Sequence, residues 1–464
     1  MRAPDQILTV AQMRAAEEAL IAGGESVESL MQTAGRGAAD WVWRIAAGRP
    51  VTVLCGPGNN GGDGYVIAEA LRERGGMITV VAAHESKTDA ARTARELYRG
   101  EVAGADAAPE GHLLVDCLFG SGLTRPLSAA DAGLLARLAH SHPKRIAIDL
   151  PSGIDSDTGA PLSPDLPQWH LTIALGAYKF AHFLMPAAAT MGALRLVPIG
   201  CTPVEGSARV IARPHLAAPA ADAHKYKRGL LGIIAGQMPG AALLAASAAQ
   251  HAGAGYVKLL TDERATPPDL VTDSRPLSEA LNDPRWNALL VGPGLGRDHE
   301  AQARLRAVLV VGNAVVLDAD ALMILDPSEL LGRSRPAIAT PHAGEFATLE
   351  RAFGLSDGGS KTDRAAALAR ASGMTIVAKG PDTVVADPDG RLACAPRASS
   401  WLSTAGTGDV LAGVIASRLA TGADPFVAAC EGVWLHADAA RIAGPTLTAG
   451  ELARAIAAAY AACL

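Results

Sequence analysis

Short runs rich in valine, isoleucine and leucine alternate with helical patterns along almost the whole chain. This alternation is typical of parallel strands that helices cover on both faces of a sheet. The first half of the chain contains six such runs: VTVLC from Val51, MITVVAA from Met77, LLVDCLF from Leu113, RIAIDL from Arg145, LTIALG from Leu171 and ALRLVPI from Ala193. They predict one complete doubly wound sheet, so the fold class is α/β.

A second series of strands follows a segment of different composition. Residues 200–223 are rich in proline and small residues, which favours an extended connection, so we place a domain boundary near residues 212–222. The later runs are LLGIIAG from Leu230, YVKLL from Tyr256, ALLVGPG from Ala288, AVVLDAD from Ala314, AIATPH from Ala337, TIVAKG from Thr375 and the hairpin pattern DTVVADPDGRLACAP. We therefore expect two α/β domains, over residues 1–212 and 213–464.

Composition directs the function towards small molecules. The formal net charge of −6 and the aromatic content of 4% argue against a nucleic-acid surface, and no apolar run reaches membrane-spanning length. The first twenty residues show no secretory pattern, so we expect a cytoplasmic protein without nucleic-acid or membrane partners. The six cysteines fall singly and no H-E-x-x-H motif occurs, which argues against disulfides and zinc.

The first candidate site begins with GPGNNGGDG, residues 56–64, between a predicted strand and a predicted helix. This context is the one in which G-x-G-x-x-G binds a dinucleotide pyrophosphate, and Asn59, Asn60 and Asp63 add polar groups that a plain turn does not need. Asp116 and Asp149 follow two further strands. Each alone could be a turn acid, but the carboxyl ends of parallel strands meet at one crevice, so together they predict a site.

The second candidate site centres on TAGTGDVLAG, residues 404–413. Gly406 and Gly408 allow close backbone approach, and the free N–H groups of the following helix can hold a phosphate beside the carboxylate of Asp409. Such an acid can take the proton from a hydroxyl that attacks a phosphoryl group. A purely structural acid at a helix start is the competing interpretation.

Other loops of the second half also follow predicted strands or open helices. Lys379, Gly380 and Thr383 are placed to meet the sugar and phosphates of an adenine nucleotide. Residues 292–296 can pass close to a ligand, and His342 can reach a polar group of the substrate. Five such loops on one sheet favour a binding site over coincidence.

Together these motifs resemble the bifunctional NAD(P)H-hydrate repair enzymes. Residues 8–210 are similar to their YjeF-type NAD(P)HX epimerase domain, and residues 224–413 to their ribokinase-like, ADP- or ATP-dependent NAD(P)HX dehydratase domain. The resemblance implies a Rossmann-like first domain that interconverts R- and S-NAD(P)HX. It implies a second domain that dehydrates S-NAD(P)HX to NAD(P)H, giving AMP from ADP, and phosphate. It also implies K⁺ in the epimerase and Mg²⁺ in the dehydratase, and we expect a homo-oligomer.

The resemblance assigns residues to each role. Asp149 and Asp409 would be catalytic, and Asn60, Asp116 and Ser152 would hold the potassium ion. The epimerase would bind its substrate through Asn59, Asn60, Gly61, Gly62, Asp63, Gly120, Ser121, Gly122, Leu123, Thr124, Arg125, Pro126 and Asp149. The dehydratase would bind its substrate through Ala241, Gly294, His342 and Asp409, and the nucleotide through Lys379, Gly380, Pro381, Asp382, Thr383 and Gly408.

The chemistry connects the two halves. Hydration of NAD(P)H leaves a hydroxyl at C6 of the ring, and phosphorylation turns this poor leaving group into a good one. Two alternatives stay open from the residues alone. One is a small-molecule kinase fused to a dinucleotide-binding domain. The other is a scaffold without catalysis, against which the acids Asp63, Asp116 and Asp149 and the lack of a basic face argue.

Overall fold

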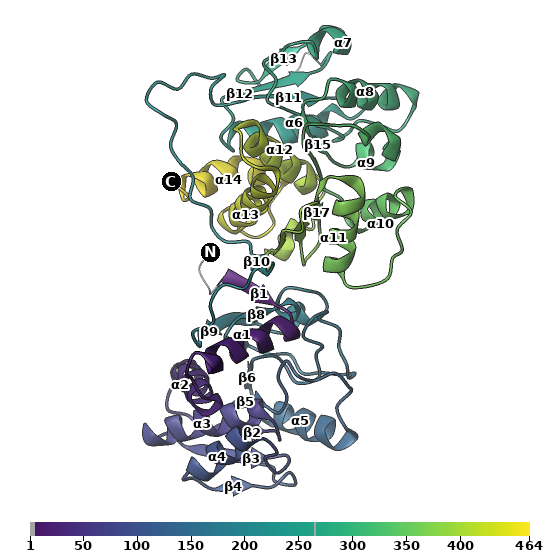
Figure 1. Ribbon diagram of the computed structural model, residues 1–464. Helices are drawn as coiled ribbons and strands as arrows, with labels where there is room; N and C mark the ends of the chain where they lie inside the picture. Colours follow the sequence, from purple (N-terminus) through teal and green to yellow (C-terminus); the bar gives the residue numbers. More distant parts are fainter. Residues whose placement is uncertain (1–4, 264–265) are drawn as a thin grey trace. The chain divides into compact units, whose positions relative to one another are not determined.

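A computed structural model describes residues 5–263 and 266–464. The chain divides into two compact units, Met1–Arg209 and Val210–Leu464 (Figure 1). The division falls a few residues before the boundary expected from composition. No helix in the described ranges is long and apolar enough to cross a membrane.

Unit 1 contains a seven-stranded sheet in which all neighbouring strands are parallel, in the order β4-β3-β2-β5-β6-β7-β9. The strands are β2 (Val51–Cys55), β3 (Ile78–Ala82), β4 (Val102–Ala103), β5 (Leu113–Cys117), β6 (Lys144–Ile148), β7 (Leu171–Leu175) and β9 (Ala193–Val197). Short strands β1 (Gln6–Leu8), β8 (Tyr178–Lys179) and β10 (Ala208–Val210) lie outside this sheet. The order reverses at β2, as in doubly wound dinucleotide-binding sheets.

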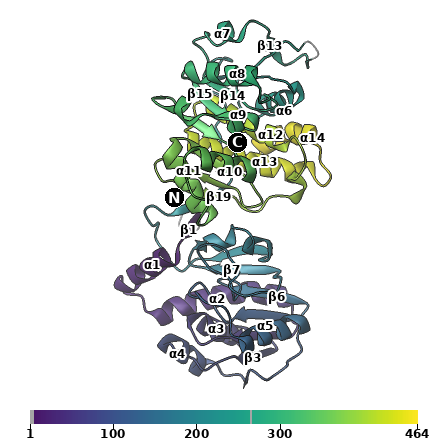
Figure 2. The same cartoon turned by 90° about the vertical axis from the view of Figure 1, so that its right-hand side faces the viewer.

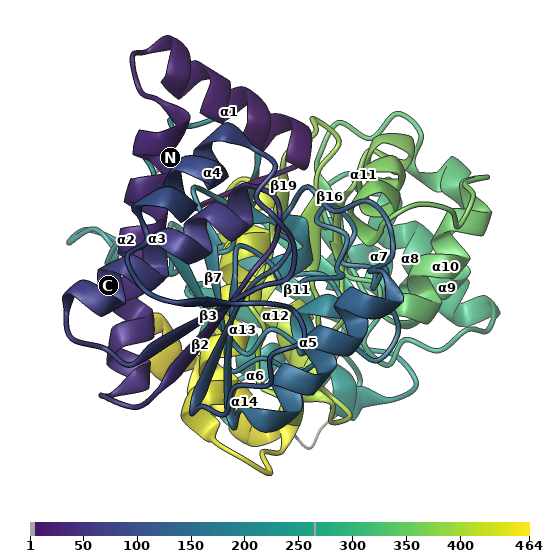
Figure 3. The ribbon, with the colours of Figure 1, turned by 90° about the horizontal axis from the view of Figure 1, so that it is seen from below.

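Helices cover both faces of this sheet because alternate strand residues point to opposite sides. Val53 and Val115 pack with α1 (Val10–Ala22), α2 (Val27–Ala46), α3 (Asn59–Glu73) and α4 (Asp89–Leu97). Leu54 and Leu114 pack on the other face with α5 (Ala129–Ser141). Figure 3 shows α5 on the opposite side of β2 and β3 from α2 and α3.

Unit 2 contains the strand order β13-β12-β11-β14-β15-β16-β17-β18-β19. The strands are β11 (Leu230–Ile234), β12 (Tyr256–Leu260), β13 (Val271–Asp273), β14 (Ala288–Val291), β15 (Ala314–Leu317), β16 (Ala337–Ala339), β17 (Thr375–Ala378), β18 (Val384–Ala386) and β19 (Leu392–Cys394). Pairing is parallel from β13 to β17 and antiparallel from β17 to β19, which confirms the predicted hairpin.

The helices of unit 2 also form two layers (Figures 1 and 2). One layer contains α6 (Pro239–Gln250), α12 (Thr407–Ala420), α13 (Pro425–Ala443) and α14 (Ala449–Ala461). The other contains α8 (His299–Val310), α9 (Asp320–Ile324), α10 (Ala343–Ala352) and α11 (Lys361–Ser372), and α7 (Leu277–Ala280) lies near β13. Ile211 and Leu216 are buried in the two hydrophobic clusters of this unit, so the chain after residue 209 already belongs to its core.

Candidate active sites

The turn after β2 runs directly into the first turn of α3. Gly58 caps the helix, so Asn59 and Asn60 lie where backbone N–H groups are free to bind an anion. A Cβ on Gly61 would lie 1.9 Å from the carbonyl oxygen of Gly56, and one on Gly62 would lie 2.6 Å from Met31. These two glycines are therefore required for packing, whereas the asparagines are available to a ligand.

A cavity of about 420 Å³ lies at this edge of the unit 1 sheet. Of the predicted epimerase residues, it is lined by Asn59, Asn60, Asp63, Gly120, Ser121, Gly122 and Asp149. A Cβ on Gly120 would lie 2.9 Å from Oδ2 of Asp149 and 3.2 Å from Cγ of Asn60, so three predicted loops meet here. The predicted contacts Leu123, Thr124, Arg125 and Pro126 lie outside the lining, and the last three are exposed.

Asp149 is the best-held carboxylate of this cavity. It follows β6 with a left-handed backbone conformation, φ 63°. Its Oδ1 accepts a hydrogen bond from Nζ of the buried Lys179 at 2.5 Å, and its Oδ2 accepts one from the backbone N–H of Ser121 at 2.9 Å. Burial alone would raise the pKa of Asp149, but the charge and hydrogen bond of Lys179 outweigh it and lower the pKa.

Two further acids, Asp63 and Glu17, line the same cavity. In the described part of the chain neither makes a hydrogen bond or ion pair. Burial, together with the negative charges of Asp149 and Glu17, raises the pKa of Asp63 well above its ordinary value. Burial also raises the pKa of Glu17, although the charge of Lys179 opposes this. The cavity therefore holds two carboxyl groups whose pKa values are shifted in opposite directions, lowered for Asp149 and raised for Asp63.

Two of the residues expected to hold potassium, Asp116 and Ser152, are hydrogen-bonded to each other at the ends of β5 and β6. Asp116 is fully buried and accepts hydrogen bonds from the N–H and hydroxyl of Ser152, at 3.0 and 2.8 Å, and from the N–H of Leu118 at 3.0 Å. Burial raises the pKa of Asp116 to about 6, although these bonds oppose the rise. Both polar atoms of the Asn60 amide are buried, and neither has a hydrogen-bond partner in the residues described.

Sequence reasoning missed Lys179, Glu17 and Arg14, which all line the epimerase cavity. Lys179 could have been found, since it lies four residues after the apolar strand β7, at the same edge as Asp149. Glu17 and Arg14 lie on α1, before the sheet begins, and no site role was predicted for either of them.

In unit 2, the loop after β17 meets the first turn of α12. Lys379 donates from Nζ to Oδ1 of Asp318 at 2.8 Å, and a Cβ on Gly408 would lie 3.5 Å from that same Nζ. Asp409 lies in the first turn of α12, which begins at Thr407 after the left-handed cap Gly406. The predicted nucleotide loop and the predicted catalytic acid are thus brought together.

The acids around Lys379 set the electrostatics of this site. Burial and the negative charge of Asp318 raise the pKa of Asp409 to about 7. Burial would lower the pKa of Lys379, but the charges of Asp318 and Glu345 raise it instead. Oε2 of Glu345 lies 3.8 Å from Nζ of Lys379. Lys379 is therefore a cation fixed among acids, and Asp409 is an acid that changes charge near neutral pH.

The remaining predicted residues of unit 2 either contact neighbouring groups of the site or lie exposed on the surface. A Cβ on Gly294 would lie 3.1 Å from that of Ala241, so these two predicted contacts are adjacent. His342 caps α10, with Nδ1 accepting from the N–H groups of Gly344 and Glu345. Asp382 binds Nζ of Lys361 at 2.5 Å.

Within the nucleotide loop, the hydroxyl of Thr383 donates to the carbonyl of Gly380 at 2.9 Å, and Pro381 is exposed. Asp318, Glu345 and Lys361 were missed as site residues. Asp318 stood in the quoted strand AVVLDAD, and its place at the carboxyl end of β15 was the available signal.

In the comparison with known proteins, the two family matches fall separately within unit 1 and unit 2. Residues 27–181 match the family described as YjeF-related protein N-terminus, and residues 231–460 match the NAD(P)H-hydrate dehydratase family. The bifunctional NAD(P)H-hydrate repair enzyme of Mycobacterium leprae is 34% identical over 458 residues, covering 94% of this chain and 93% of that protein. The enzyme of the same description from Gloeobacter violaceus is 35% identical, covering 93% and 92%.

A solved structure is also similar. It is the ADP/ATP-dependent NAD(P)H-hydrate dehydratase of Bacillus subtilis, co-crystallised with ATP and Mg²⁺. It is 28% identical, covers 54% of this chain and 95% of its own, and has a TM-score of 0.47.

Proposed function

Since the chain belongs to the family of bifunctional NAD(P)H-hydrate repair enzymes, we propose that unit 1 interconverts R- and S-NAD(P)HX and that unit 2 dehydrates S-NAD(P)HX with ADP or ATP. The observation that carries the proposal is the grouping of charged side chains in each unit: Asp149 and Asp63, with pKa values shifted in opposite directions, in one cavity of unit 1, and Asp409, with a raised pKa, near the cation Lys379 in unit 2. Acid and base roles are assigned where environments push two pKa values apart.

In unit 1 the reaction unmakes and remakes the stereocentre at C6. Asp63, the carboxyl group with the raised pKa, acts as the acid: it donates a proton to the C6 hydroxyl, and the C6–O bond breaks with its electron pair leaving in water. The lone pair of the ring nitrogen forms a double bond to C6. Water then adds to either face, and ionised Asp149 accepts its proton, which returns to Asp63 through solvent. Lys179 keeps Asp149 ionised and oriented.

The residues of unit 1 fit a potassium ion. Asp116 is a buried carboxylate with no cation partner in the described residues, and both polar atoms of the Asn60 amide are buried without a hydrogen-bond partner in those residues. Asn60, Asp116 and Ser152 would supply oxygen ligands. The ion, when bound, supplies positive charge that keeps Asp116 ionised and fixes the loops after β5 and β6 against α3. In the described ranges there is no cluster of three or more His, Cys, Asp or Glu side chains suited to a metal ion.

In unit 2 the C6 hydroxyl attacks the terminal phosphoryl group of the nucleotide while Asp409 takes the hydroxyl proton. The phosphoryl group is transferred to this hydroxyl, so ADP is converted to AMP, or ATP to ADP. The C6–O bond breaks next, phosphate departs with the electron pair, and loss of a C5 proton restores the dihydropyridine of NAD(P)H.

The N–H groups at the start of α12 and the ammonium of Lys379 stabilise the phosphoryl charge. Asp318 and Glu345 supply two carboxylates near Lys379, which fits Mg²⁺ bound through few carboxylates and the phosphates. That ion, when bound, neutralises phosphate charge.

The test is to incubate the full chain with an equilibrated mixture of NADHX epimers and ADP or ATP. We expect the reduced-cofactor absorbance to return for the whole pool, with one phosphate released per NADH formed. The competing small-molecule kinase would release a stable phosphorylated product and restore no absorbance. The cytoplasmic location and the homo-oligomeric state stay predictions.

A further inference from the structure

A second hollow, which none of these steps uses, lies at the carboxyl end of β3. Its volume is about 480 Å³. The residues of its wall that matter here are Tyr65 of α3, His84 and Glu85 after β3, and Arg92 and Arg95 of α4. We call this hollow the ribose pocket.

The order of strands places the ribose pocket relative to the epimerase cavity. The phosphate-binding turn follows β2, and the reacting groups Asp149 and Lys179 lie beyond β5, after β6 and β7. In doubly wound sheets a dinucleotide crosses the reversal point, so its adenosine ribose lies at the neighbouring strand on the opposite side. That strand is β3.

The loop between β3 and α4 connects the two hollows. Its N–H groups donate to the phosphate turn, from Ala83 to Cys55 at 3.0 Å and from Lys87 to Pro57 at 2.8 Å. The Thr88 hydroxyl donates to Oδ1 of Asn59 at 2.7 Å, and both residues line the epimerase cavity. The two hollows are therefore adjacent parts of one edge, separated by this loop.

The charged groups of the ribose pocket are held in place. The Arg95 guanidinium lies 5.6 Å from the centre of the Tyr65 ring and makes no ion pair within the residues the structure describes. Arg92 donates to the carbonyl of Lys87 at 2.6 Å and also contacts Asp89, so it is fixed at the start of α4. Guanidinium groups recognise phosphate through paired hydrogen bonds, and an acid such as Glu85 accepts from ribose hydroxyls.

We propose that the ribose pocket holds the adenosine ribose of the hydrated dinucleotide, and that Arg95 and Arg92 contact the 2′-phosphate that distinguishes NADPHX from NADHX. This inference rests on the proposed epimerase function.

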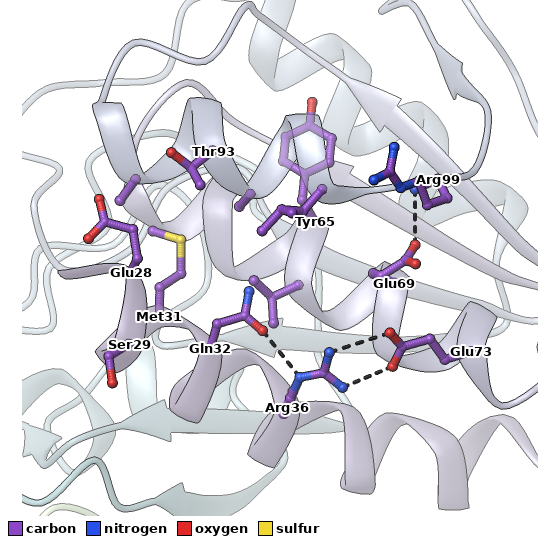
Figure 4. Close-up of a pocket in the computed structure, with 14 residues that line it drawn as sticks. Glu28, Ser29, Met31, Gln32, Arg36, Tyr65, Glu69, Glu73, Thr93 and Arg99 are labelled. Atoms are coloured by element: carbon purple, nitrogen blue, oxygen red, sulfur yellow. Dashed lines mark hydrogen bonds and ion pairs between the residues drawn. The ribbon is translucent and has the colours of Figure 1, made fainter. Parts of the chain in front are cut away.

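A neighbouring hollow of about 400 Å³ provides the contrast (Figure 4). It lies among α2, α3 and α4, and Tyr65 lines it as well. Arg36 there is bound by Glu73 at 2.9 Å and by Gln32 at 3.1 Å, as Arg92 is by Asp89, whereas Arg95 makes no ion pair in the described residues. Arg99, at its rim, supplies a matched control because it is an arginine near Tyr65 outside the ribose pocket.

The experiment measures epimer exchange by the full chain with NADPHX and with NADHX. Arg95→Gln should lower kcat/KM for NADPHX by about tenfold or more, mainly through KM, because charge-assisted hydrogen bonds to phosphate are lost. The effect on NADHX should be about twofold or less. Arg92→Gln should shift the same ratio in the same direction, and Arg99→Gln should leave it unchanged. Equal losses for both substrates, or an unchanged ratio in folded Arg95→Gln and Arg92→Gln, would overturn the inference.

Adenosine 2′,5′-bisphosphate separates this inference from the proposed function. It should compete with NADPHX for the wild type and the Arg99→Gln variant, and lose at least tenfold in affinity for Arg95→Gln. If the wild type shows no epimer exchange, the proposed function fails. Calorimetric titration of the bisphosphate into wild type and Arg95→Gln then still tests the inference about the ribose pocket. Equal affinities of the two proteins for the bisphosphate would refute it.

Discussion

Replacing Asp409 with asparagine should make unit 2 more stable and nearly inactive at the same time. Asp409 lies in the first turn of α12, where burial and the charge of Asp318 raise its pKa from 3.8 to about 7. The ionised carboxylate that serves as the base therefore exists in the folded protein at a cost in free energy. Asparagine fills the same space without a charge and cannot accept the hydroxyl proton.

The size of the stability gain follows from proton linkage. Because the folded-state pKa is the higher one, stability falls as pH rises from about 4 to about 7, and the penalty is complete above that range. A difference of about 3 pKa units sets an upper limit of about 4 kcal/mol. Asp409 is partly exposed, so solvent screening reduces this, and we expect about 1–2 kcal/mol at pH 8. That corresponds to a rise in Tm of about 2–8 °C at pH 8, and to no change in Tm near pH 4.

The assay combines thermal unfolding at pH 5 and pH 8 with dehydration of S-NADHX. The transition of unit 2 is the one that ATP shifts upwards. Turnover of Asp409→Asn should fall by about 10² to 10⁴. Glu451→Gln is the control, since Glu451 is an exposed residue in the first turn of α14 with a lowered pKa, and the change should leave turnover unchanged. Near-normal turnover, or a Tm gain that does not grow with pH, would refute the reasoning.

Three more outcomes test the sites. Asp149→Ala should rapidly restore only the dehydratase-competent part of an epimer mixture and then slow to spontaneous interconversion, and a single fast phase would remove Asp149 from the mechanism. Lys179→Met removes the charge that lowers the pKa of Asp149, so the pH profile of epimer exchange should move to higher pH, and an unmoved profile would show that Lys179 does not set it. A fragment of residues 210–464 should fold and dehydrate S-NADHX, whereas one starting at residue 216 should be less stable because it lacks buried Ile211. A soluble, folded 210–464 fragment without dehydratase activity would show that the chemistry is not in unit 2.

The sequence predicted most of the sheet framework because buried parallel strands leave a plain signal. The six strand runs of the first half correspond to β2, β3, β5, β6, β7 and β9. The strands it did not predict are short or weakly apolar, such as β13 (Val271–Asp273), where two of three residues are exposed. Neighbouring strands rather than local composition define such an element.

The candidate sites were predictable where a side chain sits in a glycine-rich turn. Asn60, Asp63 and Asp409 belong to this group. Lys179 was not predicted, because its partner Asp149 is 30 residues away in the sequence. Lys379 was predicted as a nucleotide contact, but its pairing with Asp318, 61 residues away, was not. The place of Lys179 after an apolar strand indicates the edge of the sheet where it lies, but only the assembled sheet shows which acid each lysine binds.

The backbone conformation of Asp149 limits which amino acids that position can accept, independently of catalysis. At φ 63° glycine, asparagine and aspartate are favoured over other residues, whose side chains are more strained there. A chain that had lost epimerisation but kept its fold would therefore be expected to carry asparagine or glycine there, and glutamate would be rare although it preserves the charge. The residue at position 149 would thus distinguish related proteins that retain epimerase activity from those that retain only the fold.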